Sequence, residues 1–474
     1  MNRAEHELLV TSAYTEKQLL ARFGKPAYSY RVVKGAFNSL LRQWAPAPDI
    51  EDPAAQLAEA VAPARAAGRL PIHVSFLPLQ DLNICEGAVN IGVPAWEFPD
   101  IPAEDLGGNP NENWVRQSDK LDLVITHTQF SRDAFLRAGV RTPVHVVPVP
   151  VNTAFFDIPA WQPGQKVVID CPSYVLCPGL ETPQTVARPP QVEKAPSLFK
   201  RLVVQPLKKS LPDRFVYPVQ RLKHGIHAGR VAFNEYPRRI ALIESPTLEL
   251  EGIVYTSVFN PADSRKNWQD MVTAFLYALA DRPDATLVFK LTSNKKDAQF
   301  WLRHVSDQYF RYRIPHACKV VFVTAHLSDR QMTDLARGST YYLNASRAEG
   351  SCLPLQDFLT AGRPSIAPPN TGMADSLDAD SSFLVDSDVE ATPWPHDPEM
   401  RFRTTWHRIN WASLREQIAQ SYRLAKEDPA HIVQMGTYAR EKMRDLVSPE
   451  AVWPTLKRAL DEAVGRQGTR RQAA

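Results

Sequence analysis

Short apolar runs alternate with helical patterns in two separate parts of the chain, and this repeated alternation constrains the fold more than any other feature of the sequence. In the first part, the pattern predicts strands over 72–77, 89–93, 121–126 and 144–148, and an amphipathic helix over 129–138 that Gly139 closes. In the second part, it predicts strands over 253–258, 286–291, 319–323 and 340–344 and helices over 268–279, 297–311, 328–337 and 353–361. Strands that alternate with helices of about ten residues indicate a parallel sheet. The chain is therefore predicted to be an α/β protein with two parallel-sheet halves, and a ligand cleft is expected between them at the carboxyl ends of the strands.

Prolines separate the two halves. The chain has 40 prolines in 474 residues, and the stretch 161–248 is rich in them and breaks the alternation. Within it, residues 194–230 carry nine Lys or Arg and a single acid, Asp213. Apolar residues recur there at almost every fourth position, which is the stripe of an amphipathic helix, but three prolines interrupt it and favour short helical pieces.

Two interpretations of residues 194–230 stay open. Either the apolar stripe packs on the protein itself, or the segment lies on anionic lipid, where each basic residue adds about 1 kcal/mol. Nucleic acid is disfavoured as a partner, because no groove-reading motif accompanies the charge.

Bulk composition excludes several classes of protein. Lys plus Arg is 55 against 52 Asp plus Glu, so the net charge of +3 gives no bulk attraction for polyanions. Five cysteines provide no disulfide framework and indicate a reducing compartment. No run of about 18 apolar residues is present, and the first ten residues lack the apolar core of a signal peptide. We therefore expect a cytoplasmic protein.

The stretch from Ser346 to Pro364, SRAEGSCLPLQDFLTAGRP, carries most of the chemical information. It is predicted to run from the end of a strand through a turn into a helix that starts near Leu353. Backbone N–H groups at such a helix start can hold a phosphate or diphosphate. Glu349 lies before the helix and Asp357 on it, eight residues apart, and a carboxylate at the mouth of a cleft can bind sugar hydroxyls. An ordinary strand–turn–helix with two chance acids is the alternative.

This stretch resembles the Glu-x7-Glu signature of retaining nucleotide-sugar glycosyltransferases of family 4, which have the GT-B fold of two Rossmann-like domains. Glu349-Gly350, Leu353-Pro354 and the run 361–364 match the signature in place. Two positions depart from it: Ser351-Cys352 stands where the family has Phe-Gly, and Asp357 stands where it has the second glutamate.

The resemblance implies a role for each matched position. Glu349 would contact the donor sugar, and Asp357 would lie near the nucleotide ribose. The backbone of Ser351, Cys352 and Leu353 would approach the diphosphate. The resemblance also implies that the enzyme uses no metal or other cofactor.

A second resemblance concerns the segment 259–267, which follows the strand over 253–258. In the family, this segment carries an Arg and a Lys for the donor diphosphate, and here Arg265 and Lys266 are adjacent rather than several residues apart. The resemblance implies two fixed cations that stabilise the leaving diphosphate. Surface cations at a helix start are the alternative, although positive charge there opposes the helix dipole. Lys290, near the end of the strand over 286–291, either contacts phosphate or extends to solvent as a strand-end lysine.

In the first half, Trp96-Glu97-Phe98-Pro99 resembles a Trp-Glu-x-Pro pattern of bacterial polysaccharide glycosyltransferases. The resemblance implies that Trp96 and Glu97 line the acceptor side of the cleft, the ring on a sugar face and the carboxylate on its hydroxyls. A core tryptophan and a capped loop are the alternative. His127, after the strand over 121–126, is a candidate ligand of the acceptor or donor sugar, with a buried structural histidine as the alternative.

These patterns give a domain organisation. Residues 1–160 are predicted to form an acceptor domain on which a helix over 448–465 packs back, 161–248 an insertion, 249–447 the nucleotide-sugar donor domain, and 466–474 a disordered tail.

The predicted function is transfer of a hexose from a nucleotide diphosphate sugar to a glycan acceptor in bacterial surface or exopolysaccharide synthesis. Glu349, Lys266, Arg265 and His127 are its candidate catalytic residues. The basic segment 194–230 favours a lipid-linked acceptor and peripheral binding to the inner face of the cytoplasmic membrane. Two rivals remain: a nucleotide-sugar 2-epimerase of the same fold, and a non-catalytic nucleotide-sugar-binding scaffold.

Overall fold

The computed structural model describes residues 5–13, 28–48, 50, 53–176, 242–312, 314–397 and 399–473. The predictions made for residues 194–230 lie outside the described residues. None of the helices in the described ranges combines the length and the apolarity that crossing a bilayer requires.

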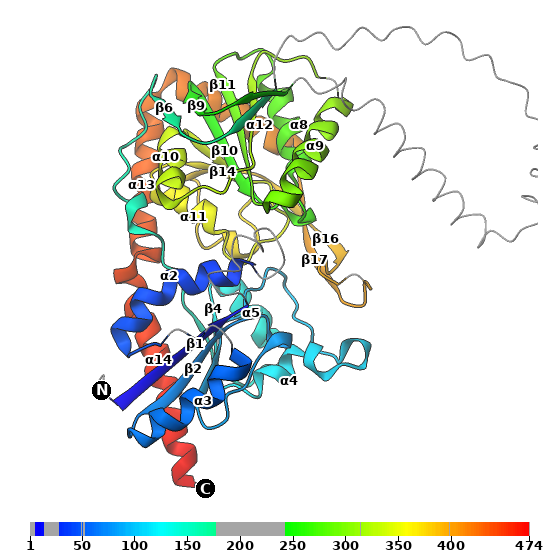
Figure 1. The fold of residues 1–474 in the computed structure, drawn as a ribbon. Coiled ribbons are helices and arrows are strands. Elements are labelled where there is room, and N and C mark those ends of the chain that lie inside the picture. The colour runs from blue at the N-terminus through cyan, green and yellow to red at the C-terminus, as the bar shows by residue number, and fades with distance from the viewer. Residues whose placement is uncertain are drawn as a thin grey trace, which may run out of the picture. The chain divides into compact units, whose positions relative to one another are not determined.

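Within the described residues, the N-terminal half is built on a five-stranded sheet with the order β1-β2-β3-β4-β5 (Figure 1). All four neighbouring pairs are parallel. The strands are β1 (His6–Ser12), β2 (Leu70–Phe76), β3 (Val89–Gly92), β4 (Leu123–Thr126) and β5 (Val144–Val146). The helices are α2 (Tyr28–Trp44), α3 (Pro53–Ala66), α4 (Trp114–Ser118) and α5 (Gln129–Arg137). Because the strands are parallel, the loops after β3 and β4 lie at the same edge of the sheet.

The C-terminal half contains, in its described part, an eight-stranded sheet with the order β15-β14-β13-β10-β11-β12-β7-β8. Its strands are β7 (Ser173–Leu176), β8 (Leu242–Ser245), β10 (Ile253–Phe259), β11 (Ala285–Leu291), β12 (Lys319–Val323), β13 (Tyr341–Leu343), β14 (Ser365–Ala367) and β15 (Ser382–Leu384). Its helices are α8 (Trp268–Leu279), α9 (Lys295–Tyr312), α10 (Asp329–Gly338), α11 (Leu353–Thr360), α12 (Trp411–Glu427) and α13 (Pro429–Val447). An antiparallel pair, β6 (Lys166–Ile169) and β9 (Leu248–Glu251), accompanies the sheet.

The strand order places a topological switch point between β10 and β13. From β10 the chain builds outward to β11 and β12 on one side, and from β13 to β14 and β15 on the other. The pairs from β15 to β12 are all parallel. In open parallel sheets, ligands bind outside the carboxyl ends of the strands at this point. The loops after β10 and β13, which carry Lys266 and Glu349, are therefore the expected site.

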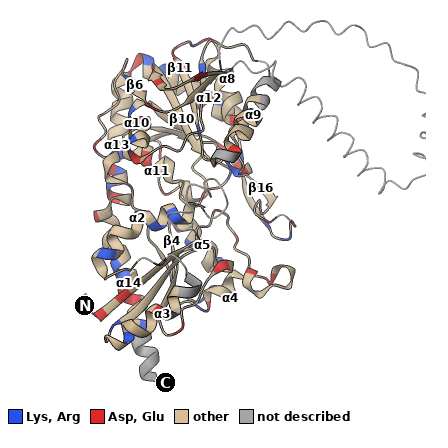
Figure 2. Cartoon of the chain, viewed as in Figure 1, with Lys and Arg blue, Asp and Glu red and all other residues tan. Residues whose placement is uncertain are grey.

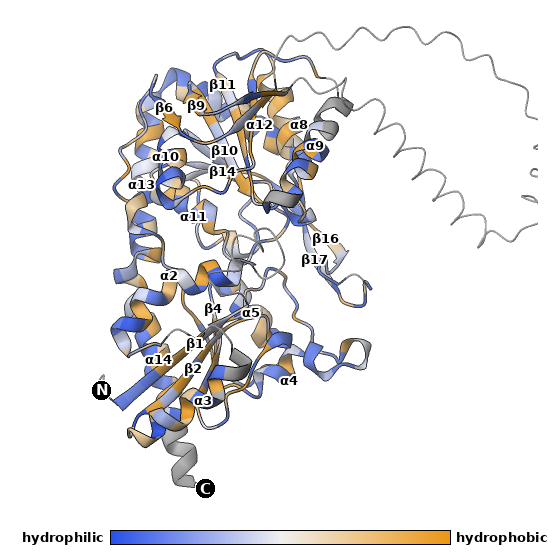
Figure 3. Ribbon diagram, in the orientation of Figure 1, coloured by the Kyte–Doolittle hydropathy of each residue, from blue (hydrophilic) through white to orange (hydrophobic). Residues whose placement is uncertain are grey.

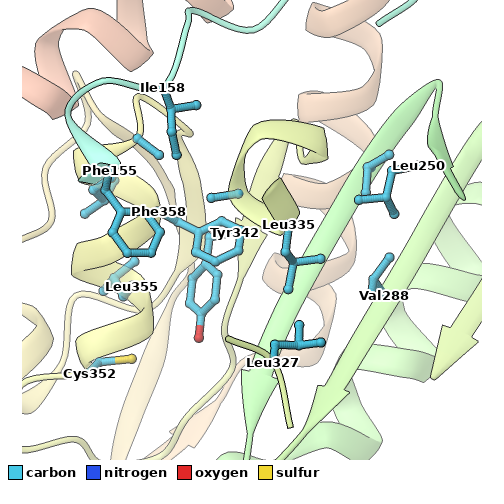
Figure 4. Packing of buried hydrophobic residues seen from close by; sticks show 14 of the residues in the cluster. Phe155, Ile158, Leu250, Val288, Leu327, Leu335, Tyr342, Cys352, Leu355 and Phe358 are labelled. Carbon is cyan, nitrogen blue, oxygen red and sulfur yellow. The ribbon is translucent and has the colours of Figure 1, made fainter. Parts of the chain in front are cut away.

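Apolar strands hold each half together. Figure 3 shows the strands of both sheets as largely hydrophobic, and Figure 2 shows charged residues mainly on helices and loops. In the C-terminal half, Tyr342 of β13 and Phe358 of α11 meet at 4.9 Å between ring centroids, and Leu335 of α10 belongs to the same core (Figure 4). This core fixes α11 against the sheet, and with it the loop that carries Glu349.

The last helix, α14 (Pro449–Ala473), packs on the N-terminal half. Val452, Leu456 and Leu460 are buried in the same cluster as the apolar residues of β2, β3 and α2, and Trp44 Nε1 donates to Asp461 Oδ1 at 3.2 Å. The helix continues to Ala473, so the prediction of a disordered tail over 466–474 is wrong. An anchored helix continues readily through Arg, Gln and Ala, which have good helix propensity.

A β-hairpin that the sequence analysis does not predict stands out from the C-terminal half (Figure 1). Its strands are β16 (Ser387–Pro393) and β17 (Arg403–Ile409). Trp394 and Phe402, next to the two strands, pack against buried aromatic residues of the N-terminal half, among them Trp96.

The predicted strands and helices from residue 72 to 148 and from 253 to 361 are present within a few residues of their predicted ends. The chain before residue 70 contains β1, α2 and α3, which the sequence analysis does not assign. The segment 161–248 also differs from prediction at both ends, because β6 and β7 at one end and β8 at the other are strands of the C-terminal half. The C-terminal half therefore begins before residue 249.

Candidate functional site

The loop between β13 and α11 carries Glu349, and Asn344 holds the loop at both ends. Its side-chain oxygen accepts a hydrogen bond from the Ser346 backbone at 2.6 Å, and its amide nitrogen donates to Cys352 Sγ at 3.2 Å. Glu349 is buried, with 5% of its surface exposed. A second loop, after β14, supports it: the Glu349 N–H donates to Thr371 Oγ1, and the Gly372 N–H donates to the Glu349 carbonyl, each at 2.9 Å.

Backbone groups approach closely at two glycines of these loops, Gly372 and Gly350. A Cβ added to Gly372 would overlap the Gly350 carbonyl, and a Cβ on Gly350 would lie 3.1 Å from the Trp96 carbonyl oxygen. Thr371 has a φ of 47°, in the left-handed region that favours glycine. The sequence analysis missed this supporting loop, although Asn370-Thr371-Gly372 directly after a short strand is a turn signal that could have indicated it.

Lys266 and Glu349 form a buried ion pair. Lys266 Nζ lies 2.6 Å from Glu349 Oε1, and 18% of the lysine side chain and 6% of the glutamate side chain are exposed. Burial lowers the pKa of Lys266, but the Glu349 carboxylate outweighs it and the pKa is raised. The lysine is therefore positively charged at neutral pH and remains partly open to solvent.

Arg265, the neighbouring cation, is directed elsewhere. Its Nη2 lies 2.6 Å from Asp263 Oδ2 and 3.0 Å from Glu97 Oε1, and its Nη1 donates to the Ala348 carbonyl at 2.7 Å. Burial alone would lower the pKa of Arg265, but the two carboxylates raise it. Asp263 is a further site residue that the sequence analysis missed; its place two residues before Arg265 is a weak signal.

The N-terminus of α11 lies at the end of the same loop. Cys352 adopts a φ of 58°, its thiol is buried, and burial and the Glu349 charge raise its pKa. Ser351 Oγ is buried and has no hydrogen-bond partner in the described part of the chain. Leu353 is partly buried and packs against the core of the N-terminal half. A neutral thiol, an unpaired hydroxyl and the positive end of the α11 dipole suit an anion better than a cation here.

Asp357 and Lys290 are both ionisable groups in unfavourable surroundings. Asp357 lies on α11, and burial together with the Asp329 charge raises its pKa to about 7. Lys290 is 3% exposed, and burial lowers its pKa to about 8, against a smaller effect of Cys171. The prediction that Lys290 extends to solvent is therefore wrong, because its side chain is enclosed in the sheet; phosphate contact stays a prediction.

His127 follows β4 in the N-terminal half and is buried. Its Nδ1 lies 3.0 Å from the Val147 carbonyl, and its ring stacks on Phe37 at 5.9 Å. A carbonyl can only accept, so Nδ1 carries the proton and Nε2 is an acceptor in the neutral ring. Burial lowers the pKa of His127 to about 4, so the ring is neutral at pH 7. It can accept a hydrogen bond but does not serve as an acid.

Trp96 and Glu97 are placed differently from each other. Trp96 is 2% exposed, donates from Nε1 to the Asp100 carbonyl at 3.0 Å, and touches the rings of Trp114 and Trp394. The prediction that its ring stacks on an acceptor sugar does not fit this packing, because other rings already cover it. Glu97 reaches Arg265, with 19% of its side chain exposed.

Comparison with known proteins supports the fold. No protein-family model matches the sequence, and no curated protein is significantly similar to it. Among solved structures, a sucrose-phosphate synthase from Thermosynechococcus elongatus superposes with a TM-score of 0.51 at 13% identity, over 98% of this chain and 100% of that one. HepE from Anabaena, in complex with UDP-glucose, matches with a TM-score of 0.47 at 13% identity, over 96% of this chain and 99% of that one. The chain has the GT-B fold, with two Rossmann-like halves.

Proposed function

We propose that this chain is a retaining glycosyltransferase that uses a nucleotide diphosphate sugar as donor. The observation that carries the proposal is the Lys266–Glu349 pair at 2.6 Å, on the loops after the two strands that flank the switch point and beside the N-terminus of α11. A fixed cation and a helix N-terminus suit the diphosphate, and the carboxylate suits the hydroxyls of the sugar attached to it. The sucrose-phosphate synthase of the same fold is consistent with this class of reaction.

The residues imply a division of labour in the reaction. Lys266, the Ser351 hydroxyl and the N–H groups at the start of α11 would stabilise the charge that grows on the departing diphosphate. The bond from the anomeric carbon to the phosphate oxygen breaks, and a bond to the acceptor oxygen forms on the same face. The acceptor's proton passes to the departing diphosphate oxygen. His127, neutral at pH 7, would accept a hydrogen bond from a sugar hydroxyl.

Finer features of the proposal rest on sequence. The Glu349-Gly350 and Leu353-Pro354 matches support family 4, and Trp96-Glu97 supports a polysaccharide-type enzyme that transfers a hexose. A lipid-linked acceptor and attachment to the inner face of the cytoplasmic membrane rest on the charge of residues 194–230, which lie outside the described residues. A high-salt wash should then release the protein from membranes; retention that salt does not change would count against this part.

Thermal unfolding in the presence of UDP, GDP, ADP and their common sugars tests the donor site. A ligand at about 100 times its Kd stabilises the folded state by about 2.7 kcal/mol. We expect one nucleotide series to raise the Tm of the wild type, and Lys266→Met to lose that response. Lys319→Met is a matched control, because Lys319 pairs with Glu251 on an exposed part of the C-terminal half. If well-folded wild type responds to no nucleotide, the donor-site proposal fails.

Turnover separates the transferase from its rivals. A transferase releases nucleoside diphosphate only when an acceptor is present, apart from slow hydrolysis, whereas an epimerase alters the sugar of the donor without an acceptor. A non-catalytic scaffold binds the donor and consumes nothing. Ser351-Cys352 and Asp357, which depart from the family signature, are the reason to keep the scaffold as the second candidate.

A further inference from the structure

The guanidinium of Arg265 is already committed to protein groups. Its two terminal nitrogens contact Asp263, Glu97 and the Ala348 carbonyl at 2.6 to 3.0 Å. Its Nε is enclosed and has no partner among the described residues. Only 6% of the side chain is exposed, against 18% for Lys266. A diphosphate could reach Arg265 only by displacing carboxylates that hold it.

Arg265 also holds the backbone directly before Glu349. Its carbonyl accepts a hydrogen bond from the Arg347 N–H at 2.8 Å, and its Nη1 donates to the Ala348 carbonyl at 2.7 Å. These two contacts fix the peptide groups 346–347 and 348–349, and the second of these joins Ala348 to Glu349. Any shift of the guanidinium is therefore passed to the Glu349 carboxylate, which Lys266 contacts at 2.6 Å.

The N-terminal half supplies the other side of this arrangement. Glu97 reaches Arg265 at 3.0 Å. Thr128 Oγ1 donates to the Gly350 carbonyl at 3.0 Å. Gly350 lies against the Trp96 carbonyl, which itself accepts from Ser131 Oγ at 2.7 Å. The N-terminal half thus holds the Gly350 peptide directly, through Thr128, and the Ala348 peptide only through Arg265, which Glu97 contacts.

We propose that Glu97 is a positioning residue, which holds Arg265 across the two halves so that Arg265 braces the backbone of the Glu349 loop. Glu97 is then not an acceptor ligand, and Arg265 is not a diphosphate ligand. Lys266 alone of the two adjacent cations serves the diphosphate. The inference rests on the proposed function for its kinetic consequence, but the brace itself is a property of the protein without ligand.

Hydrogen exchange measures the brace without any substrate. In the full-length protein, we expect Glu97→Gln to speed exchange of the backbone amides in the peptide 344–352 by about tenfold. Thr128→Val, which removes the contact with the Gly350 carbonyl, should affect the same peptide. Glu104→Gln changes an exposed carboxylate of the same half and should leave the peptide unaffected. Unchanged exchange in Glu97→Gln overturns the proposal, whatever the protein's activity.

Kinetics and nucleotide affinity then assign the roles. With the nucleotide series identified by thermal unfolding, Glu97→Gln should lower kcat about 10- to 100-fold and leave the Kd of the nucleoside diphosphate within about twofold. Adding Thr128→Val should lower kcat by less than the product of the two single effects, because both act on one loop. A raised acceptor KM with unchanged kcat would instead make Glu97 an acceptor ligand.

Arg265→Lys completes the assignment. It should keep nucleotide affinity near the wild-type value, whereas Lys266→Met should lose it. Equal losses in the two variants would make Arg265 a diphosphate ligand and overturn that part of the proposal. If Arg265→Lys does not fold, the Glu97 and Thr128 variants decide. Failure of the proposed function shows separately, as a wild type that binds or turns over no donor.

Discussion

The two halves contribute different chemistry to the candidate site. The C-terminal half supplies the charges there, with Lys266 paired to Glu349 and Arg265 paired to Asp263. The N-terminal half supplies mainly neutral groups: His127 has a pKa lowered to about 4 by burial, and Thr128 offers a hydroxyl. Among the described residues of the N-terminal half, Glu97 is the one carboxylate that directly contacts these charged residues, and it does so at Arg265.

This difference indicates a different role for the side chains of each half. Charges fixed in a low-dielectric surrounding stabilise a charged leaving group, as the role proposed for the C-terminal half requires. Neutral groups can hold a loop or orient a hydroxyl without competing for the diphosphate. The comparison predicts that substitutions in the N-terminal half change stability and loop position, whereas in the C-terminal half substitution of the charged Lys266 changes nucleotide affinity and substitutions around the charged pair change stability. The following substitutions test this division.

Trp96→Ala is expected to have the largest effect, and it should act on stability. Removing a buried aromatic side chain costs about 3–5 kcal/mol, and the ring is packed among Trp114, Phe98 and Trp394. Denaturant unfolding measures the loss. Phe300→Ala is the control, because Phe300 is 60% exposed and should change stability by about 0.5 kcal/mol or less. A stable Trp96→Ala protein that has lost only acceptor affinity would break the comparison.

Lys266→Met should act on the donor rather than on the fold. Loss of one fixed cation from a developing charge lowers kcat about 100- to 1000-fold. Because the substitution leaves Glu349 buried without its partner, Lys266→Met combined with Glu349→Gln separates the cost to folding from the cost to catalysis. Initial rates with the identified donor, beside unfolding curves, measure both. Full activity in Lys266→Met would refute the assignment.

Gly372→Ala should destabilise the Glu349 loop by about 1–3 kcal/mol, as overpacking does. The added Cβ would overlap the Gly350 carbonyl, so the two loops must move apart. Gly35→Ala is a matched control, because Gly35 lies in α2 with nothing within 4 Å of its Cβ position. The control should be neutral or slightly stabilising. Equal behaviour of the two variants in thermal unfolding would contradict the close contact.

Asp357→Asn should have the smallest effect, and the effect should depend on pH. Burial and Asp329 raise the pKa of Asp357 from 3.8 to about 7, so the folded state binds more protons than the unfolded state between these values. Below about pH 4 the carboxyl of Asp357 is protonated in both states, and the free energy of unfolding then falls as the pH rises to about 7. Asp357→Asn should match the wild type at pH 4 and be more stable at pH 8 by about 1 kcal/mol, allowing for partial solvent screening. Paired Tm values at the two pH values test this; no difference at pH 8 would contradict it.

Most helices and strands could be predicted from sequence, because buried apolar residues recur at a regular spacing along them. The helix Trp268–Leu279 and the strand Lys319–Val323 are observed with their predicted bounds. The β16–β17 hairpin gave no such signal, since little of it is buried, residues such as Asp388 are exposed, and prolines lie near its turn. The helix Tyr28–Trp44 did offer apolar residues at helical spacing and could have been predicted.

The sequence indicated which residues form the site, but it did not indicate which partners their side chains would contact. Glu349 and Lys266 lie together because each follows a strand at the switch point, and their roles toward a donor stay predictions. Arg265 and Lys266 are neighbours in sequence, yet consecutive residues of the short turn Ser264–Lys266 point to different partners. Trp96 could not be distinguished from an acceptor ligand by sequence, because the rings that cover it come from Trp114 and from Trp394, almost 300 residues further along.

The position of α14 has a consequence for how the protein is made. Val452, Leu456 and Leu460 complete the core of the N-terminal half, so that half cannot close until a ribosome has made α14, which follows all of the C-terminal half. The C-terminal half ends at α13 and can complete its own core earlier. The usual order, in which the N-terminal unit of a growing chain folds first, is thereby reversed. Until α14 emerges, the newly made N-terminal half lacks the apolar side chains that complete its core.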